Sequence, residues 1–289
     1  RPNHGRWPAD GNVDKAMFRA AGQHGLLGMA VPEEYGGGGV DDFRYNVVID
    51  EVVTASGASA SGLCITLHND ICLPYFLSYG TDEQRTRWLP GLVSGELMTA
   101  IAMTEPGTGS DQAGIATSAI RDGDDYVING SKTYITNGTR ADFITLMVKT
   151  DPDAGHSGIS IIVCPTDVNG FSISKKLEKA GNWASDTAEL FFEDVRVPKR
   201  YLVGQEGMGF MYLMQNFQSE RLVGCVSGLS GAKLALDRSV QWGRERVAFG
   251  KPLIKREYWQ QKLVELYTKY EAAKALSYNA CAAYNEDKY

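Results

Sequence analysis

Apolar residues recur with the spacing of an α-helix over the first third of the chain. They return every three or four positions in Phe43–Val53 and Gly62–Leu77, which predicts two long helices. The segment Thr81-Asp-Glu-Gln84 has the capping-box pattern that starts a helix. Pro32–Gly39 interrupts the pattern, because its four consecutive glycines are too flexible to continue a helix. Together these signals predict an N-terminal helical domain over residues 1–98.

The apolar spacing changes to the alternation of a β-strand in residues 99–207. In Tyr126–Thr136 it predicts two strands that flank a tight turn at Asn129-Gly130, since Asn-Gly is a preferred dipeptide of hairpin turns. Further strands are predicted at Phe143–Val148, Gly158–Val163, Phe171–Ser174 and Glu189–Val195. Several strands with turn signals at short spacing and no helix between them predict an antiparallel barrel or sandwich.

Helical spacing returns in residues 208–289. Two long helices are predicted, from Phe210 to about Arg246 and from Tyr258 to about Ala283, and Phe249-Gly-Lys-Pro252 breaks the pattern between them. Two amphipathic helices cannot bury their apolar faces on each other alone, so we expect partners from further sequence or from other subunits. The chain also starts without a methionine and stops inside a helical pattern. We therefore expect an α+β multidomain protein with an incomplete C-terminal helical bundle.

The composition is that of an ordinary globular protein, with 43% hydrophobic and 22% charged residues among 289. The net charge of −6 comes from charges mixed along the chain, so we expect no nucleic-acid partner, which would need a basic face. No apolar run approaches the roughly 20 residues that span a bilayer, so we expect no membrane partner. The five cysteines are scattered and never form a C-x-x-C pair, which predicts no disulfide framework and no metal site, and favours a reducing compartment.

Two segments of the predicted β domain offer groups that suit a ligand. Thr104-Glu-Pro-Gly-Thr-Gly-Ser-Asp111 combines hydroxyls with glycines, whose backbone N–H groups are unhindered, as the polar edge and phosphates of a cofactor require. By composition alone, an ordinary surface turn is the commoner interpretation. Tyr134-Ile-Thr136 offers an aromatic face and a hydroxyl on a strand, although by themselves these residues are better explained by a cross-strand pair.

Two segments of the C-terminal helices carry candidate charges. Glu220 lies in Phe217–Cys225 with apolar neighbours on both sides, and a carboxylate that faces an apolar pocket becomes a stronger base. The alternative is a surface glutamate beside Arg221. Arg244–Gly250 could hold a phosphate through its arginines, or could simply be a charged helix end.

Taken together and in this order, six segments strongly resemble the acyl-CoA dehydrogenase family over essentially Gly22 to Ala283. They are Pro32-Glu-Glu-Tyr-Gly-Gly37, Gly80-Thr-Asp-Glu-Gln84, Ala102–Asp111, Asn129–Gly138, Ser185–Val195 and Arg246-Val-Ala-Phe-Gly250. Any one of them could occur by chance, whereas six in register almost could not.

The resemblance implies an N-terminal helical domain (1–98), a middle β-barrel domain (99–207), a C-terminal helical bundle domain (208–289), and a homotetramer with one FAD per subunit. The residues that it places around the flavin are Ile101, Met103, Thr104, Gly109, Ser110, Tyr134, Ile135 and Thr136. Thr104 and Thr136 would lie near the polar edge of the flavin, and Tyr134 stands where the family frequently has tryptophan. Arg246 and Phe249 would contact the FAD of a neighbouring subunit.

The family divides by the position of its catalytic glutamate. Most members carry it in C-terminal sequence that this chain lacks, whereas the isovaleryl and long-chain enzymes carry it in a segment like Glu220-Arg-Leu222. The resemblance therefore implies that Glu220 takes the α-proton of an acyl-CoA while a hydride leaves the β-carbon for the flavin. The residues that it places near the CoA arm are Ser110, Gln218, Ser219 and Arg221. Gln218 and Glu257 depart from the common family residues.

The expected function is the α,β-dehydrogenation of a fatty acyl-CoA to the trans-2-enoyl-CoA, with electrons passed to an electron-transfer flavoprotein. The resemblance favours a long-chain substrate. The alternatives are a branched, isovaleryl-type substrate, a flavin oxidase or monooxygenase on the same fold, and a non-catalytic acyl-CoA-binding protein. A bacterial cytoplasm and a mitochondrial matrix both fit, since both are reducing.

Overall fold

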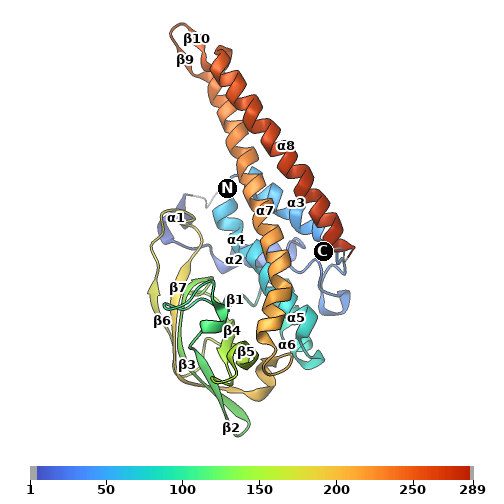
Figure 1. The fold of residues 1–289 in the computed structure, drawn as a ribbon, viewed down its shortest axis with the longest axis vertical. Helices are drawn as coiled ribbons and strands as arrows, with labels where there is room; N and C mark the ends of the chain where they lie inside the picture. Colours follow the sequence, from blue (N-terminus) through green and yellow to red (C-terminus); the bar gives the residue numbers. More distant parts are fainter. Residues whose placement is uncertain (1–4, 287–289) are drawn as a thin grey trace. The chain divides into compact units, whose positions relative to one another are not determined.

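The structure is a computed structural model that describes residues 5–286 and divides into two compact units (Figure 1). The first unit comprises the described residues of Arg1–Asp41 and Ala60–Gln218, and the second those of Asp42–Ser59 and Ser219–Tyr289. No described helix is both long and apolar enough to cross a membrane. The boundaries of the three expected domains stay a prediction.

Five described α-helices of the first unit precede its sheet. They are α1 (Arg6–Asp10), α2 (Lys15–Gln23), α4 (Ser59–Thr66), α5 (Leu73–Tyr79) and α6 (Asp82–Ser94). The π-helical segment Leu67–Cys72 joins α4 to α5, so the predicted helix over Gly62–Leu77 is confirmed with one local widening. The capping box at the start of α6 is also confirmed, because the Thr81 hydroxyl accepts a hydrogen bond from the Gln84 N–H while the Gln84 side chain accepts one from the Thr81 N–H.

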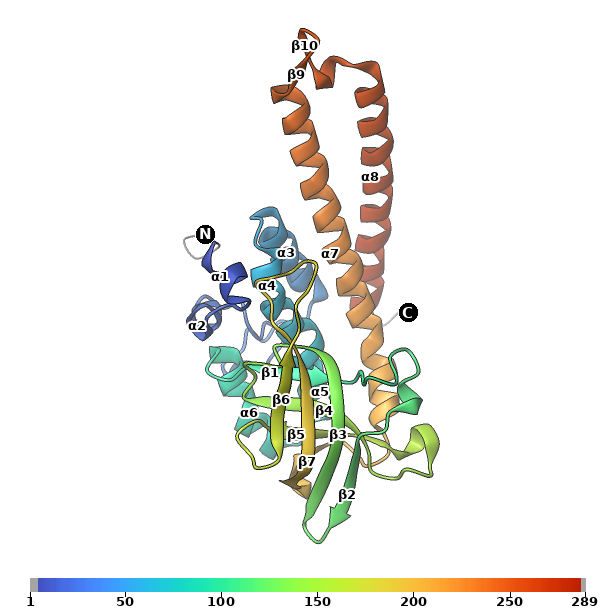
Figure 2. The same ribbon diagram turned by 90° about the vertical axis from the view of Figure 1, so that its left-hand side faces the viewer.

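An eight-stranded sheet forms the core of the first unit (Figure 2). Its strands are β1 (Thr99–Ala102), β2 (Ser118–Asp122), β3 (Asp125–Thr136), β4 (Phe143–Lys149), β5 (Ile159–Pro165), β6 (Phe171–Lys176), β7 (Thr187–Pro198) and β8 (Leu202–Val203). The order is β6-β7-β3-β2-β4-β5-β8, and β1 pairs in parallel with β4. Most other pairs are antiparallel, which confirms a β domain, whereas the expected closure into a barrel stays a prediction.

The predicted turn at Asn129-Gly130 is wrong, because β3 runs without a break from Asp125 to Thr136. The turn lies earlier, at Gly123-Asp124 between β2 and β3. Gly130 instead marks a β-bulge, where the register against β7 shifts and the backbone passes Thr117 closely. A Cβ atom on Gly130 would lie 2.5 Å from the Thr117 hydroxyl oxygen. The glycine therefore permits close packing within the sheet rather than a reversal of the chain.

The central strands explain why this sheet is stable enough to carry a site. All but the last residue of β4 and of β5 are buried, so both faces of these strands are covered. The side chains of Phe76, Trp88 and Phe143 pack edge to face or tilted against one another on one side, with ring centroids 5.6–5.8 Å apart. Each large apolar side chain that is fully buried in this way contributes roughly 1.5–3 kcal/mol.

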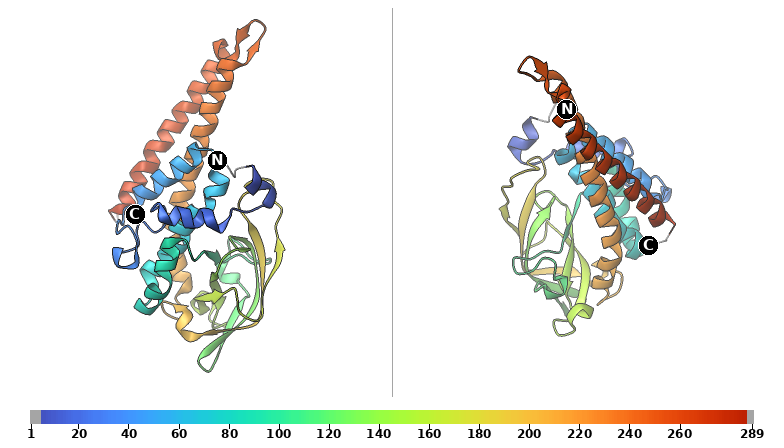
Figure 3. Two further views of the ribbon diagram at one scale, coloured as in Figure 1. Left: turned by 180° about the vertical axis from the view of Figure 1, so that it is seen from behind. Right: turned by 45° about the horizontal axis from the view of Figure 1, so that its top comes forward.

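The second unit is built on two long antiparallel helices, α8 (Glu257–Asn285) and the part of α7 (Gly209–Glu245) from Ser219 onward. They stay side by side in both further views (Figure 3). A short hairpin of β9 (Val247–Ala248) and β10 (Lys251–Pro252) joins them and confirms the predicted break. Both residues of its tip, Phe249 and Gly250, have positive φ, as a tight hairpin turn requires.

Helix α3 (Phe43–Ala55) completes the second unit. Phe43 and Val47 pack against Val223 and Val226 of α7 and Cys281 of α8 in a small apolar cluster. Large apolar side chains elsewhere on the two long helices stay exposed in the single chain: Trp242, Tyr258, Val264 and Leu276. The expectation that these helices bury too little of their apolar surface on each other is therefore confirmed.

Candidate functional site

The first unit brings together the two segments that the sequence singled out on the β domain. The backbone N–H of Thr133 donates to the carbonyl oxygen of Thr104 at 2.9 Å, and the Lys132 amine donates to the carbonyl of Met103 at 2.9 Å. The chain that follows β1 therefore lies directly beside the end of β3, although some 30 residues separate them in the sequence.

Five residues along this junction are at least partly exposed, and we call them the β1–β3 shelf. They are Ile101, Met103, Thr104, Tyr134 and Thr136. Tyr134 is 68% exposed and the other four are half-buried, with Ile101 and Met103 also packed against the core, so apolar, aromatic and hydroxyl groups are partly accessible along the junction. Within the described residues, the hydroxyls of Thr104 and Thr136 have no hydrogen-bond partner in the chain. Ile135 is only 3% exposed, so it offers its backbone rather than its side chain.

Tyr134 owes its exposure to a second irregularity in β3. The register against β7 shifts between Lys132 and Ile135, and Tyr134 has a φ of 62°. A non-glycine residue in this left-handed region costs roughly 1–3 kcal/mol, and such strain persists only where the surrounding structure enforces it. The bulge turns the phenol ring away from the core, as bulges beside functional sites often do.

A buried ion pair holds the loop between the shelf and β2. The Lys132 amine lies 2.8 Å from Oε1 of Glu105, and the two side chains are 0% and 7% exposed. The same carboxylate accepts hydrogen bonds from the N–H groups of Ala116 at 2.6 Å and Thr117 at 3.0 Å. Glu105 therefore joins the two ends of the loop 106–116 to β3.

Burial and charge act in opposite directions on this pair. Burial lowers the pKa of Lys132 to about 8, although the Glu105 carboxylate opposes the change. Burial also raises the pKa of Glu105, but the charge and hydrogen bond of Lys132, with those of Thr117 and Ala116, outweigh it and leave the pKa lowered. Sequence analysis missed this pair. The available signal was a lysine that shares the alternation of the apolar inward residues Tyr126 and Ile128 of the same strand.

The loop that the pair supports exposes backbone donors. Gly107 and Gly109 have no atom within 4 Å of the position that a Cβ would take. Within the described residues, the N–H groups of Gly109 and Ser110 donate to no acceptor in the chain. Gln112 stabilises the loop, because its side-chain amide donates a hydrogen bond to the Gly109 carbonyl. Oε1 of the same side chain is buried without a hydrogen-bond partner in the described part of the chain. Such a loop suits a ligand that presents oxygen acceptors.

The helical candidates lie on α7. Gln218 is the last residue of the first unit, and Ser219, Glu220 and Arg221 belong to the second, so each is placed only within its own unit. Ser219 is buried, Glu220 is half-buried, and Gln218 and Arg221 are exposed. Gly224 follows Glu220 by one helical turn and has open space where its Cβ would be. The position one turn after Glu220 therefore carries no side chain, and nothing else in the described part of the chain fills it.

Arg246 and Phe249 lie far from Glu220 within the second unit. The 26 residues from Glu220 to Arg246 span about 39 Å at the rise of an α-helix. The side chain of Phe249 is 97% exposed at the hairpin tip, with the Arg256 guanidinium 5.5 Å from its ring centre. These two residues therefore belong to a different site from Glu220 of the same chain.

Comparison with known proteins bears on the whole chain. Three family models match successive segments: "Acyl-CoA dehydrogenase, N-terminal domain" over residues 1–96, "Acyl-CoA dehydrogenase, middle domain" over residues 100–195, and "Acyl-CoA dehydrogenase, C-terminal domain" over residues 207–289. The matches confirm the expected order of a helical, a β and a second helical domain.

Individual proteins agree with these matches. The mitochondrial long-chain specific acyl-CoA dehydrogenase of Sus scrofa is 39% identical over 92% of this chain and 62% of its own length. The mitochondrial short-chain specific acyl-CoA dehydrogenase of Bos taurus is 36% identical over 95% of this chain and 68% of its own length. A crystal structure of an acyl-CoA dehydrogenase from Geobacillus kaustophilus is 43% identical, covers 100% of this chain and 76% of that chain, and superimposes with a TM-score of 0.97. The chain thus spans between about three fifths and three quarters of the length of these relatives.

Proposed function

Because the chain belongs to the acyl-CoA dehydrogenase family, we propose that it forms the larger part of an enzyme that removes two hydrogens from the α and β carbons of an acyl-CoA thioester. The observation that carries the proposal is the β1–β3 shelf, which joins an exposed aromatic ring and two unpaired hydroxyls to a loop with free N–H donors. Members of the family are FAD-dependent flavoproteins.

The residues of the first unit fit a flavin. A flat aromatic ring system needs an apolar or aromatic surface, which Ile101, Met103 and Tyr134 provide. Its polar edge needs hydrogen-bond partners, and the Thr104 and Thr136 hydroxyls have none within the described part of the chain. Gly109 and Ser110 offer backbone donors to oxygen atoms of the cofactor or of the CoA arm. The buried Oε1 of Gln112 is a further unsatisfied acceptor beside this loop.

Glu220 is the proposed base. Bound FAD would supply the acceptor for the hydride, so the protein itself must remove the α-proton, which is only weakly acidic. A positioned carboxylate contributes roughly 10²–10⁴-fold to such a step. Hydrogen bonds to the thioester carbonyl stabilise the developing enolate charge, and exclusion of water strengthens them. Gln218, Ser219 and Arg221 flank Glu220 on α7 and would contact the CoA arm.

A long-chain acyl group is the proposed substrate. The Glu220-Arg-Leu222 segment resembles the group of long-chain and isovaleryl enzymes, and the relative from Sus scrofa, named long-chain specific, is 39% identical. The relative named short-chain specific is 36% identical, which is too small a difference to decide alone. The open position at Gly224 leaves room on α7 beside the base.

The proposed assembly is a homotetramer that passes electrons to an electron-transfer flavoprotein. The separation of about 39 Å between Glu220 and Arg246 supports a role for Arg246 and Phe249 at the FAD of another subunit. The exposed apolar side chains of α7 and α8 would then be buried between subunits. The mitochondrial names of two relatives and the bacterial source of the third support a mitochondrial matrix or a bacterial cytoplasm.

The test is an anaerobic titration of the purified full-length protein with palmitoyl-CoA and, separately, isovaleryl-CoA, followed by the flavin absorbance band. Bleaching by either thioester establishes dehydrogenation. Bleaching at a lower concentration of palmitoyl-CoA supports the long-chain substrate, and the reverse favours the branched one. Rapid recovery of the band in air would identify an oxidase instead. A bound flavin that neither thioester reduces would exclude the proposed activity for these substrates.

A further inference from the structure

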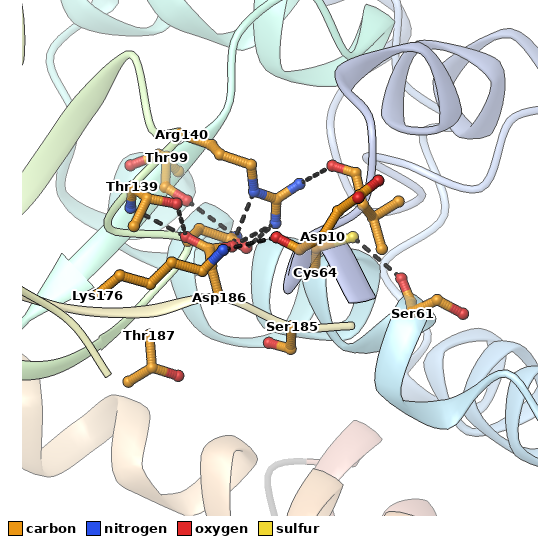
Figure 4. A network of polar contacts seen from close by, with 12 residues as sticks. Asp10, Ser61, Cys64, Thr99, Thr139, Arg140, Lys176, Ser185, Asp186 and Thr187 are labelled. Atoms are coloured by element: carbon orange, nitrogen blue, oxygen red, sulfur yellow. Dashed lines mark hydrogen bonds and ion pairs between the residues drawn. The ribbon is translucent and has the colours of Figure 1, made fainter. Parts of the chain in front are cut away.

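A second buried ion pair lies in the first unit, next to the end of β3 that carries the shelf. The side chains of Arg140 and Asp186 are 10% and 0% exposed. Figure 4 shows Arg140 and Thr139 converging on the Asp186 carboxylate. Oδ1 accepts from Nε of Arg140 at 2.8 Å and lies 2.7 Å from its Nη2, and Oδ2 accepts from the N–H and the hydroxyl of Thr139 at 2.9 and 2.6 Å.

The remaining donors of Arg140 reach two other segments. Nη1 donates to the carbonyl of Val13, and Nη2 donates to the side-chain oxygen of Asn137 at 3.1 Å. The side-chain amide nitrogen of Asn137 donates a hydrogen bond to the carbonyl oxygen of Thr99, at 3.5 Å. The Asn137 side chain is therefore held from both ends, by Arg140 and by the first residue of β1.

These contacts converge on the shelf. Asn137 directly follows Thr136, and Thr136 lies opposite Thr187 in the β3–β7 pairing, one residue after Asp186. Thr99 precedes Ile101 by two residues on β1. The network thus joins the start of β1, the end of β3 and the start of β7, and two of these three points adjoin shelf residues.

Asn137 also holds the backbone in an uncommon conformation, with a φ of 64° and no exposure. The turn that follows is closed by hydrogen bonds from the N–H groups of Gly138 and Ala141 to the carbonyls of Ile135 and Asn137, at 3.2 and 2.9 Å. The conformation at Asn137 sets the direction in which β3 ends. Loss of the Asn137 side chain would release the end of β3, which includes Thr136, from its link to Arg140 and β1.

A buried ion pair is a weak source of stability, because the loss of hydration offsets most of its attraction. What the pair does supply is fixed geometry, since the planar guanidinium donates to Asp186 and Asn137 in set directions. We propose that Arg140 and Asp186 are positioning residues, which act through Asn137 to fix the direction of the Thr136 hydroxyl and its spacing from Ile101, and so tune the binding and reduction potential of FAD. The inference rests on the proposed function.

The decisive variant is Asn137→Gly in the full-length protein. Glycine keeps the left-handed backbone without strain and removes only the side-chain link between Arg140 and Thr99. Asn182→Gly is the matched control, because Asn182 has a φ of 53° in the same unit and lies exposed outside the network. We expect Asn137→Gly to weaken FAD binding by roughly tenfold and to shift the midpoint potential of the bound flavin. Asn182→Gly should match the unchanged protein in both.

Arg140→Lys separates positioning from a merely structural role. Lysine keeps the charge beside Asp186 but cannot donate to Asp186 and Asn137 in the fixed directions of the guanidinium. We expect it to retain most of the folding stability and to shift the potential in the same direction as Asn137→Gly. An unaltered potential and FAD affinity in both variants would overturn the inference. Absence of FAD from the unchanged protein would instead contradict the proposed function.

Discussion

The surroundings of the β1–β3 shelf and the helical pair α7–α8 differ in which side chains they bury. Around the shelf even charged groups are buried, and each of them is paired: Lys132 with Glu105, and Arg140 with Asp186. On the helical pair, large apolar side chains are exposed, among them Val264 at 65% and Leu276 at 72%. The first region buries its charges within one chain, whereas the second leaves large apolar side chains exposed, as interaction surfaces often do.

This difference in burial suits two different requirements, fixed geometry at a binding site and an open surface for assembly. Buried, hydrogen-bonded charges fix local geometry, and the loss of one partner carries a high cost. A surface for assembly has to stay open until another chain arrives, so its residues contribute little to the stability of a single chain. Variants in the two regions should therefore affect different measurements.

The largest effect is expected from Glu220→Gln, which would separate turnover from cofactor binding. Glutamine keeps the shape of the side chain but cannot accept the α-proton, so kcat should fall by roughly 10²–10⁴-fold. Flavin content should stay at the level of the unchanged protein, because the shelf lies in the other unit. Stopped-flow measurement of flavin bleaching by the acyl-CoA checks both. Normal turnover would show that the base lies elsewhere.

The next effect concerns the charges beneath the shelf. Glu105→Gln leaves the Lys132 ammonium buried beside a neutral amide, and loss of one partner of a buried pair costs about 3–5 kcal/mol. Urea unfolding measures the change. Asp122→Asn is the control, because the Arg196–Asp122 pair is 56% and 61% exposed and should lose at most about 1 kcal/mol. Equal losses in the two variants would contradict the special role of the buried pair.

His68 in the first unit and Asp50 in the second should respond to acid with opposite sign. His68 is fully buried on the π-helical segment, with Nε2 3.1 Å from the Leu92 carbonyl, and burial lowers its pKa from 6.5 to about 4. Between these two values the unfolded chain binds more protons than the folded one, so the first unit loses stability as the pH falls, by roughly 3 kcal/mol in full.

Asp50 in the second unit has the reverse effect. Its carboxylate is 4% exposed, with one oxygen bonded to the Ser227 hydroxyl and the other unpartnered, and burial raises its pKa above 3.8. The folded form then binds more protons, so its contribution to stability is lost as the pH rises above 3.8. Hydrogen exchange between pH 4 and 7 resolves the two units. His68→Gln should remove the acid loss of the first unit only, and an unchanged profile would refute the assignment.

The smallest effect on the single chain is expected from Phe249→Ala. The side chain is 97% exposed, so unfolding free energy should change by less than about 0.5 kcal/mol. If the hairpin reaches the FAD of another subunit, flavin retention and assembly should nevertheless weaken. Sedimentation and flavin content measure these, with Trp183→Ala as an exposed aromatic control in the first unit. Unaltered assembly and flavin content would exclude that role for Phe249.

Local periodicity predicted most of the elements, because the apolar spacing of a helix or a strand depends only on residues that are close together in the sequence. The predicted strand at Phe143–Val148, for example, is observed at Phe143–Lys149. The same reasoning failed at Asn129-Gly130, where a dipeptide typical of turns lies inside β3. The close approach of Thr117, just before β2, accompanies that conformation, and it cannot be predicted from the neighbours of the glycine in the sequence.

The site shows the same limit more strongly. Residue types alone left Thr104 and Tyr134 as candidates with commonplace alternatives, and it was the family resemblance that grouped them. The charged pairs that support them were missed, since Glu105 and Lys132 are 27 residues apart and Arg140 and Asp186 are 46 apart. No local sequence pattern predicts an ion-pair partner at such a separation. A charged residue at an inward strand position predicts burial, but not the identity of its counter-ion.

The π-helical turn at Leu67–Cys72 makes the chain tolerant of one particular change in its own length. Such a turn holds one residue more than an α-helical turn, so deletion of a single residue there would leave a more regular helix. The later side chains would keep their present directions, whereas deletion of one residue from a regular α-helical turn would rotate them by about 100°. Tyr75 and Phe76, both fully buried, would therefore stay in the core. In an alignment, a one-residue gap at this place would mark the loss of the wide turn rather than a different core.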